Sequence, residues 1–289
     1  MPAFETYSRW SSQGLFYTDS WNDDTDTILP DDQEEREQPP KPVALLLHGL
    51  GSSSSFYHTI IPTISSSIRC IAFDYPGSGM SPPTPLSSPH SIETLAKTAI
   101  ELIDELGFKE KIIVVGHSIG SIVASHLTAE YPDRIGGVVL LGAINPREGL
   151  AYMIKSRIDS ITQSGEGLIN LASSLPQMTT SRTSTPLQRA FIRSSVLSTD
   201  PNEYIRLSQV IIKSKQPLYS KIKAPLLILA GMDDMKVSSE EIFEAYGTDS
   251  HKKQLEWLKD CGHWTCVEQG DVVAERIKKF VEQDADVVS

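Results

Sequence analysis

The chain has 289 residues, 39% of them hydrophobic, which is enough for one large domain with a full core. Its 37 acidic and 26 basic residues give a formal net charge of −11, which argues against nucleic acid or an anionic membrane surface as a partner. Three cysteines argue against a disulfide framework and for a reducing compartment. Because Glu5, Arg9 and Asp19 interrupt the first twenty residues, we expect no signal peptide, no membrane-spanning segment and a cytoplasmic location.

The N-terminal part predicts a strand pair followed by a solvated loop. Residues 5–10 and 15–18 favour a short antiparallel pair, since turn-forming residues separate them. Residues 21–42 are acidic and rich in proline, a composition that buries too little apolar surface to order itself. A docking site for a basic partner is the alternative interpretation of this loop.

Two apolar runs, residues 43–47 and 68–73, predict buried strands of a parallel sheet. Asp74 follows the second run and begins a glycine-rich turn. We expect its carboxylate to accept hydrogen bonds from loop N–H groups, although a catalytic role stays open at this point. Residues 92–106 then repeat apolar side chains at helical spacing, and Gly107 marks the end of that helix.

Residues 111–131 predict the centre of the site. Four β-branched residues, 112–115, indicate a buried strand, and an amphipathic helix follows until Pro132. Between them lies Gly116-His117-Ser118-Ile119-Gly120, and a G-x-S-x-G in that position is typical of a nucleophile elbow. The serine is held there in a strained backbone conformation, and the glycines remove side chains that would collide. We therefore predict Ser118 as a nucleophile, with an ordinary turn as the alternative.

An elbow enzyme also needs two N–H groups that stabilise an oxyanion. One belongs to the residue after the nucleophile, which is Ile119 in this chain. The other comes from the loop after an earlier strand, here His48-Gly49-Leu50-Gly51, and Leu50 is the best candidate.

The second half of the chain predicts a continued sheet with an insertion. Residues 137–141, 225–230 and 254–258 favour further strands, so strands and helices alternate as in a mostly parallel α/β sheet. Residues 146–219 contain only helical patches, and an insertion at the carboxyl end of a strand is placed to act as a lid. Asp200 is expected to cap its last helix, whose predicted face consists of Tyr204, Ile205, Ser208, Ile211 and Ile212.

The base and the acid are the remaining parts of a serine site. His263 follows the last strand, whereas the other histidines lie in turns, helices or loops. The acid should follow an earlier strand between the serine and the histidine, which leaves Asp233 and Asp234. Ser238 and Glu241 form a capping-box pattern that predicts the start of the next helix.

Together these motifs resemble the α/β-hydrolase superfamily, in the form that has a serine nucleophile and a helical cap. The resemblance implies a mostly parallel central sheet with helices on both faces, a core of residues 1–145 and 220–289, and a cap of residues 146–219. It also selects Asp234 over Asp233 as the acid and makes Asp74 structural. The matching stretches are HG at 48–49, DYPGSGMS at 74–81, GHSIG at 116–120, EYPDR at 130–134, GMDD at 231–234 and GH at 262–263.

Two features depart from the family pattern or leave a choice within it. Ser121 stands where relatives often have a second glycine, which affects helix packing and not catalysis. Some relatives take the acid from the end of the preceding strand, and Glu148 is the candidate in that case. No metal site is evident, since Cys261 and Cys266 flank His263 without a second pair of ligands.

The stretch DPNEY at 200–204 resembles the caps of small esterases, enol-lactonases and cofactor-free haloperoxidases. The resemblance implies a small-molecule substrate, no cofactor, and hydrolysis of a carboxylic ester or lactone through an acyl-enzyme on Ser118. A carbon–carbon bond hydrolase with the same three residues is one alternative. A non-catalytic ligand receptor or scaffold is another, because the fold alone does not define a function.

Overall fold

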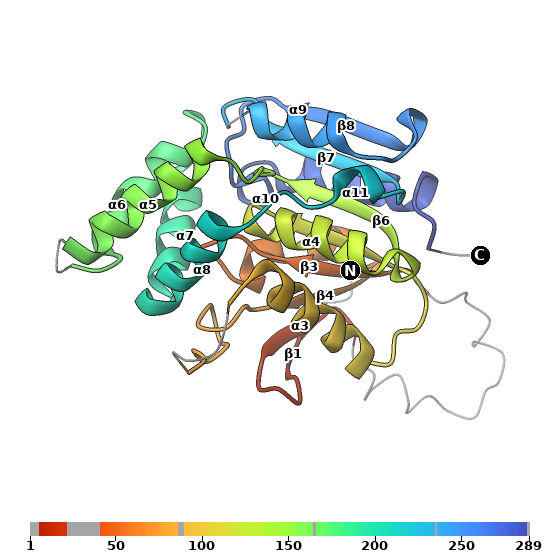
Figure 1. Ribbon diagram of the computed structural model, residues 1–289, viewed down its shortest axis with the longest axis horizontal. Coiled ribbons are helices and arrows are strands. Elements are labelled where there is room, and N and C mark those ends of the chain that lie inside the picture. The colour runs from red at the N-terminus through yellow and green to blue at the C-terminus, as the bar shows by residue number, and fades with distance from the viewer. Residues whose placement is uncertain (1–5, 22–40, 86–89, 164–165, 235, 288–289) are drawn as a thin grey trace.

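The structure is a computed structural model that describes residues 6–21, 41–85, 90–163, 166–234 and 236–287. Most of the acidic segment, residues 21–42, lies outside these residues. The two interpretations of that segment, a solvated loop and a docking site, therefore stay predictions. An eight-stranded sheet forms the centre of the molecule, in the order β1-β2-β4-β3-β5-β6-β7-β8 (Figure 1). The strands are β1 (Tyr7–Trp10), β2 (Phe16–Asp19), β3 (Val43–Leu47), β4 (Arg69–Phe73), β5 (Ile112–His117), β6 (Ile135–Leu141), β7 (Leu226–Gly231) and β8 (Lys253–Leu258).

The sheet is antiparallel at one edge and parallel elsewhere. β1 pairs with β2 and β2 with β4 in antiparallel register, whereas all pairs from β4 to β8 are parallel. Every residue of β5, β6 and β7 is buried, as expected where helices cover both faces of a parallel sheet. The predicted α/β class and the predicted N-terminal strand pair are both confirmed.

Helices cover the two faces of the sheet in two groups. One group is α3 (Ile92–Glu105), α4 (Ile119–Glu130) and α9 (Lys236–Ala245), in which α3 packs against α4. The other is α2 (Ile61–Ile64), α10 (Thr265–Glu268) and α11 (Gly270–Gln283), in which α11 packs against both shorter helices. Short 3₁₀ helices join the elements: η2 (Ser54–Thr59), η3 (Pro132–Arg134), η4 (Tyr219–Lys221) and η5 (Ser250–Lys252).

Between β6 and β7 the described residues form four α-helices: α5 (Glu148–Gln163), α6 (Ile169–Thr179), α7 (Pro186–Leu197) and α8 (Pro201–Lys213). They lie together beyond one end of the sheet, at the left of Figure 1. We call residues 146–219 the helical insertion. Its two ends meet, because the hydroxyl of Tyr219 donates a hydrogen bond to Oδ1 of Asn145 across 3.2 Å.

Helix α8 begins where the sequence predicts and buries a wider face than predicted. The Asp200 carboxylate accepts hydrogen bonds from the N–H groups of Asn202 and Glu203, which makes it the expected N-cap. Tyr204, Ser208 and Ile211 are buried as expected, while Ile205 and Ile212 are only partly buried. The buried face also contains residues that the prediction left out: Glu203, Leu207 and Val210.

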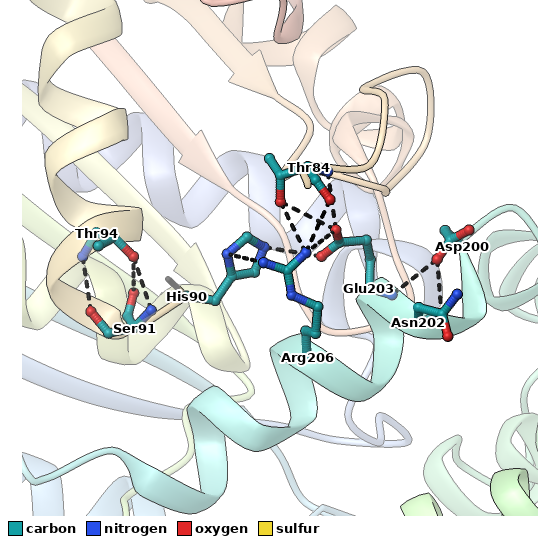
Figure 2. A network of polar contacts seen from close by, with 8 residues as sticks. All are labelled: Thr84, His90, Ser91, Thr94, Asp200, Asn202, Glu203 and Arg206. Carbon is teal, nitrogen blue, oxygen red and sulfur yellow. Dashed lines mark hydrogen bonds and ion pairs between the residues drawn. The ribbon is translucent and has the colours of Figure 1, made fainter. Parts of the chain in front are cut away.

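The buried carboxylate of Glu203 joins α8 to the body of the molecule (Figure 2). Its Oε1 accepts from Nη1 of Arg206 at 2.6 Å and from the N–H of Thr84 at 3.1 Å. Its Oε2 lies 3.0 Å from Nε2 of His90. Arg206 Nη2 lies 3.3 Å from Nδ1 of His90, so Nδ1 is the acceptor in that contact. We call Thr84, His90, Glu203 and Arg206 the Glu203 network.

The predicted capping box of Ser238 and Glu241 is wrong. Helix α9 spans Lys236–Ala245, so both residues lie inside the helix and not at its start. The Glu241 carboxylate instead accepts a hydrogen bond from Nδ2 of Asn145 across 2.9 Å. A contact with a distant residue has replaced the local one that the pattern indicated.

The cysteines are free thiols in the protein interior. Cys70, Cys261 and Cys266 are buried, and burial raises the pKa of each thiol above its ordinary value. In the part of the chain that the structure describes, no helix has the length and apolar character needed to cross a membrane.

Candidate active site

The turn between β5 and α4 holds Ser118 in an unusual backbone conformation. Its φ of 54° and ψ of −117° place its backbone in a region that residues other than glycine rarely adopt. A Cβ atom on Gly116 would lie 2.2 Å from the carbonyl oxygen of Gly120, and one on Gly120 would lie 2.2 Å from that of Leu47. Both glycines are therefore needed for the close approach, as the sequence predicts.

Three predicted site residues meet at the carboxyl ends of three strands. Ser118 follows β5, Asp234 follows β7 and His263 follows β8. The Oγ of Ser118 lies 3.0 Å from Nε2 of His263, and Nδ1 of His263 lies 2.8 Å from Oδ2 of Asp234. Because a carboxylate accepts only, Nδ1 carries the ring proton and Nε2 is free to accept from the serine hydroxyl.

The other two candidate acids do not contact the histidine in this structure. Asp233 is exposed, and its N–H donates to the carbonyl oxygen of Cys261. Glu148 is exposed at the start of α5. Asp234 is the candidate acid that lies within hydrogen-bond distance of His263.

His117 contributes to the site in a way that the sequence analysis missed. It is buried, its ring stacks on Phe56 with centroids 4.1 Å apart, and its Nε2–H donates to the carbonyl oxygen of His263 across 2.9 Å. Burial lowers the pKa of His117 to about 3, so the ring is neutral at pH 7. The N–H of His263 donates to the carbonyl oxygen of Thr179 in α6, so its backbone is held from both sides. Adjacency to Ser118 was the one signal in the sequence.

Ser121 has its own place in the turn. Its Oγ donates to the carbonyl oxygen of Ser118 across 2.5 Å and accepts from the N–H of Ile144 across 3.2 Å. The hydroxyl thus links the serine turn to the loop after β6.

The loop that carries Leu50 is held by a buried acid. Oδ1 of Asp74 accepts from the N–H of Ser54 at 2.6 Å, and Oδ2 accepts from that of Met80 at 2.8 Å. These contacts confirm the expected structural role of Asp74. Leu50 borders the same cavity as Ser118. Ile119 is the first residue of α4, so its N–H has no acceptor within the helix.

A cavity of about 300 Å³ opens over Ser118 and His263. Its lining is mostly apolar, and it comes both from loops at the strand ends and from helices α5, α6 and α8. Representative lining residues are Leu50, Leu150, Ile154, Leu175, Tyr204 and Trp264. A concave, largely apolar pocket with a few convergent polar groups suits a small organic molecule. Among the described residues, no group of three or more His, Cys, Asp or Glu side chains is arranged to hold a metal ion.

The α/β-hydrolase architecture is defined by a parallel sheet and three residues at its strand ends. These are a serine on a strained turn after one strand, an acid after a later strand and a histidine after the last strand. The model of the alpha/beta hydrolase family matches residues 44–276, so the chain belongs to this family. The resemblance predicted from the sequence motifs is confirmed.

Individual relatives extend this comparison. The 2-hydroxy-6-oxo-6-phenylhexa-2,4-dienoate hydrolase of Burkholderia cepacia is 25% identical over 243 residues, which are 78% of this chain and 83% of that protein. Several other curated relatives match a shorter region, and the chain spans less than half of their length.

Two solved structures share the fold. A thermophilic esterase from Thermogutta terrifontis is 18% identical and superposes with a TM-score of 0.76, covering 96% of this chain and 98% of its own. The enol-lactonase from Burkholderia xenovorans is 23% identical, also with a TM-score of 0.76, covering 85% of this chain and 93% of its own. At these identities the likeness concerns the fold alone.

Proposed function

We propose that the protein is a serine hydrolase that cleaves a carboxylic ester or lactone of a small organic substrate through an acyl-enzyme on Ser118. The observation that carries this proposal is the chain of contacts from Ser118 to His263 to Asp234, at 3.0 and 2.8 Å, beneath an apolar cavity. A nucleophile within reach of a base, which is itself oriented by a third group, is the arrangement that activates a serine.

In the proposed first half of the reaction, Nε2 of His263 takes the hydroxyl proton while Ser118 Oγ attacks the carbonyl carbon of the substrate. Asp234 holds the ring through Nδ1–H and stabilises the positive charge that forms on it. The protonated ring then gives its proton to the departing alcohol oxygen, which leaves the acyl group on Ser118. In the second half, His263 takes a proton from water while the water oxygen attacks the acyl carbon. The ring then returns this proton to Ser118 Oγ as the bond between Oγ and the acyl carbon breaks, which releases the acid and restores the serine hydroxyl.

The attack on the carbonyl carbon places a negative charge on the carbonyl oxygen, and hydrogen-bond donors must stabilise that charge as it forms. We assign the N–H groups of Leu50 and Ile119 to this role. The position of Ile119 at the positive end of the α4 dipole supports the assignment. Asp74 acts on Leu50 only indirectly, because it fixes the loop that carries this residue.

We further propose that the helical insertion is a cap over a core of residues 1–145 and 220–289. The contribution of α5, α6 and α8 to the cavity lining supports this division, as does the contact between the two ends of the insertion. The cap then forms the part of the pocket that selects the substrate, and the cavity volume favours a small one. The cytoplasmic location stays a prediction from the sequence.

A carbon–carbon bond hydrolase is the second candidate, and the similarity to the Burkholderia cepacia dienoate hydrolase over 78% of the chain is the observation that favours it. The same serine, histidine and acid would serve both reactions. Parallel assays with aryl esters, lactones and a ring-cleavage dienoate therefore decide between the two candidates.

Labelling with a fluorophosphonate probe tests the nucleophile directly. We expect the probe to label the wild type and not Ser118→Ala, and this variant to lose several orders of magnitude in kcat. Ser125→Ala is a matched control, since Ser125 is buried on α4 but bonded to Tyr246. A receptor or scaffold without activity would hydrolyse none of the substrates, and residual turnover by pure Ser118→Ala would overturn the assignment.

A further inference from the structure

Arg157 gives the cavity a positive charge that the proposed hydrolysis does not use. Among the described lining residues it is the one cationic side chain, and the anionic ones are Asp233 and Asp234. It lies on α5, in the helical insertion, whereas both acids follow β7. The positive charge therefore comes from a different wall of the cavity than the negative charges.

The identified partners of Arg157 are neutral. Its guanidinium lies beside the phenol of Tyr204, and Nη2 lies 3.9 Å from Sδ of Met153. Burial raises the pKa of Tyr204 to about 12, although the neighbouring guanidinium acts in the opposite direction. Tyr204 is therefore a neutral phenol at pH 7 and does not balance the charge.

Several arginines elsewhere in the protein pair with an acid, and among the described residues Arg157 does not. No Asp or Glu oxygen of the described residues forms an ion pair with Arg157 within 4.0 Å. By contrast, five other arginines each form such a pair: Arg69 with Asp19, Arg134 with Asp104, Arg147 with Glu241, Arg206 with Glu203 and Arg276 with Glu256.

A half-buried guanidinium in a mostly apolar cavity loses part of its hydration. An anion that enters the cavity can replace the lost water contacts. The flat fork of N–H donors matches a carboxylate in both shape and charge. The neighbouring Tyr204 ring is almost fully buried, so it gives the guanidinium a fixed neighbour before a ligand arrives. Asp233 is exposed to solvent, and water and salt screen its repulsion of an incoming anion.

We propose that Arg157 binds a carboxylate group of the substrate, so that the preferred substrates are esters or lactones that also carry a free carboxylate. The identity of the cleaved bond rests on the function proposed above. The carboxylate site does not, because Arg157 forms it without Ser118.

A turnover experiment measures the effect on selectivity. The 4-nitrophenyl monoester of glutaric acid is compared with its terminal amide, which has nearly the same shape and no charge. We expect the wild type to favour the charged ester, and Arg157→Gln to lower the ratio of the two kcat/KM values about 10- to 100-fold. Arg157→Lys should keep part of the preference, because it retains the charge without the fork. Arg193→Gln, at an exposed arginine of α7, should leave the ratio unchanged.

A binding experiment separates the two proposals. Ser118→Ala protein is titrated calorimetrically with glutaric acid monoanilide and with its terminal amide, with and without Arg157→Gln. If the monoanilide acid binds more tightly than its amide only when Arg157 is present, the carboxylate site is supported. If, in addition, the wild type hydrolyses no ester, the proposed hydrolysis fails and the carboxylate site still stands. If esters are hydrolysed while Arg157→Gln changes neither the kcat/KM ratio nor the binding difference, the carboxylate site is overturned and the hydrolase stands.

Discussion

His117 and His263 are joined through the backbone, because the Nε2–H of His117 donates a hydrogen bond to the carbonyl oxygen of His263 across 2.9 Å. The residue before the proposed nucleophile thus holds the peptide that carries the proposed base. Since His117 also stacks on Phe56, its ring has little freedom to move. The distance from Ser118 to His263 depends on this contact as well as on the strands.

Replacement of His117 tests its positioning role. His117→Phe keeps a ring against Phe56 and removes the donor to His263, so we expect kcat to fall about tenfold or more, with a smaller change in KM. His117→Gln retains an N–H donor and should recover part of kcat. Steady-state kinetics on one ester measures both variants, and unchanged kcat in correctly folded His117→Phe would contradict the role.

The pH dependence of stability gives an independent test of the same residue. Burial lowers the pKa of His117 to about 3 from 6.5, so between these values the unfolded chain binds a proton that the folded protein does not. This histidine therefore lowers stability as pH falls below 6.5, by about 1.4 kcal/mol per pH unit. From pH 7 to pH 5, His117→Gln should lose about 2 kcal/mol less unfolding free energy than wild type, as measured by urea unfolding.

The exposed His251 provides the control for that measurement. His251→Gln should follow the wild-type pH dependence closely. An equal loss of stability in wild type and His117→Gln would show that His117 is protonated in the folded protein.

The choice of acid is tested by three amide substitutions. Asp234→Asn removes the charge beside His263 and should lower kcat by about three to four orders of magnitude. Asp233→Asn and Glu148→Gln should have mild effects, since both residues are exposed and away from the ring. If Asp234→Asn keeps near-wild-type kcat and either Asp233→Asn or Glu148→Gln is inactive, the residue changed in the inactive variant is the acid that orients His263.

The Glu203 network should stabilise the fold more than any surface pair. Glu203→Gln removes a buried charge that pairs with Arg206, so we expect a loss of about 3 to 5 kcal/mol in the free energy of unfolding. Glu101→Gln, which breaks an exposed pair with Lys97, should cost about 0.5 kcal/mol or less. Urea unfolding compares the two variants, and similar losses would mean that the network contributes no more than a surface contact.

Features that depend on short sequence patterns could be predicted well. The strand, turn and helix around Ser118 are adjacent in sequence, and the two glycines leave few other conformations. Strand order along a parallel sheet then brings the ends of β5, β7 and β8 to one edge, which is why Asp234 and His263 could be named as site residues. Their catalytic roles stay a proposal.

Features that depend on contacts between distant segments could not be predicted. Glu203 lies in an amphipathic helix where a glutamate normally faces water, and only the fold brings His90 and Thr84 to it. The capping-box prediction failed for the same reason, since Glu241 bonds to Asn145 and not to its own helix start. The sequence could not indicate that Arg157 faces the cavity either, because the packing of α5 against α8 decides this.

The contact between Asn145 and Tyr219 has a consequence for protein engineering. Because this side-chain contact joins the two ends of the insertion, a helical segment from a relative can be grafted between these two residues without a change in strand order. The graft has one further requirement. Helix α8 rests on Thr84 and His90, which lie outside the segment, so a chimera must exchange these two residues together with the helices.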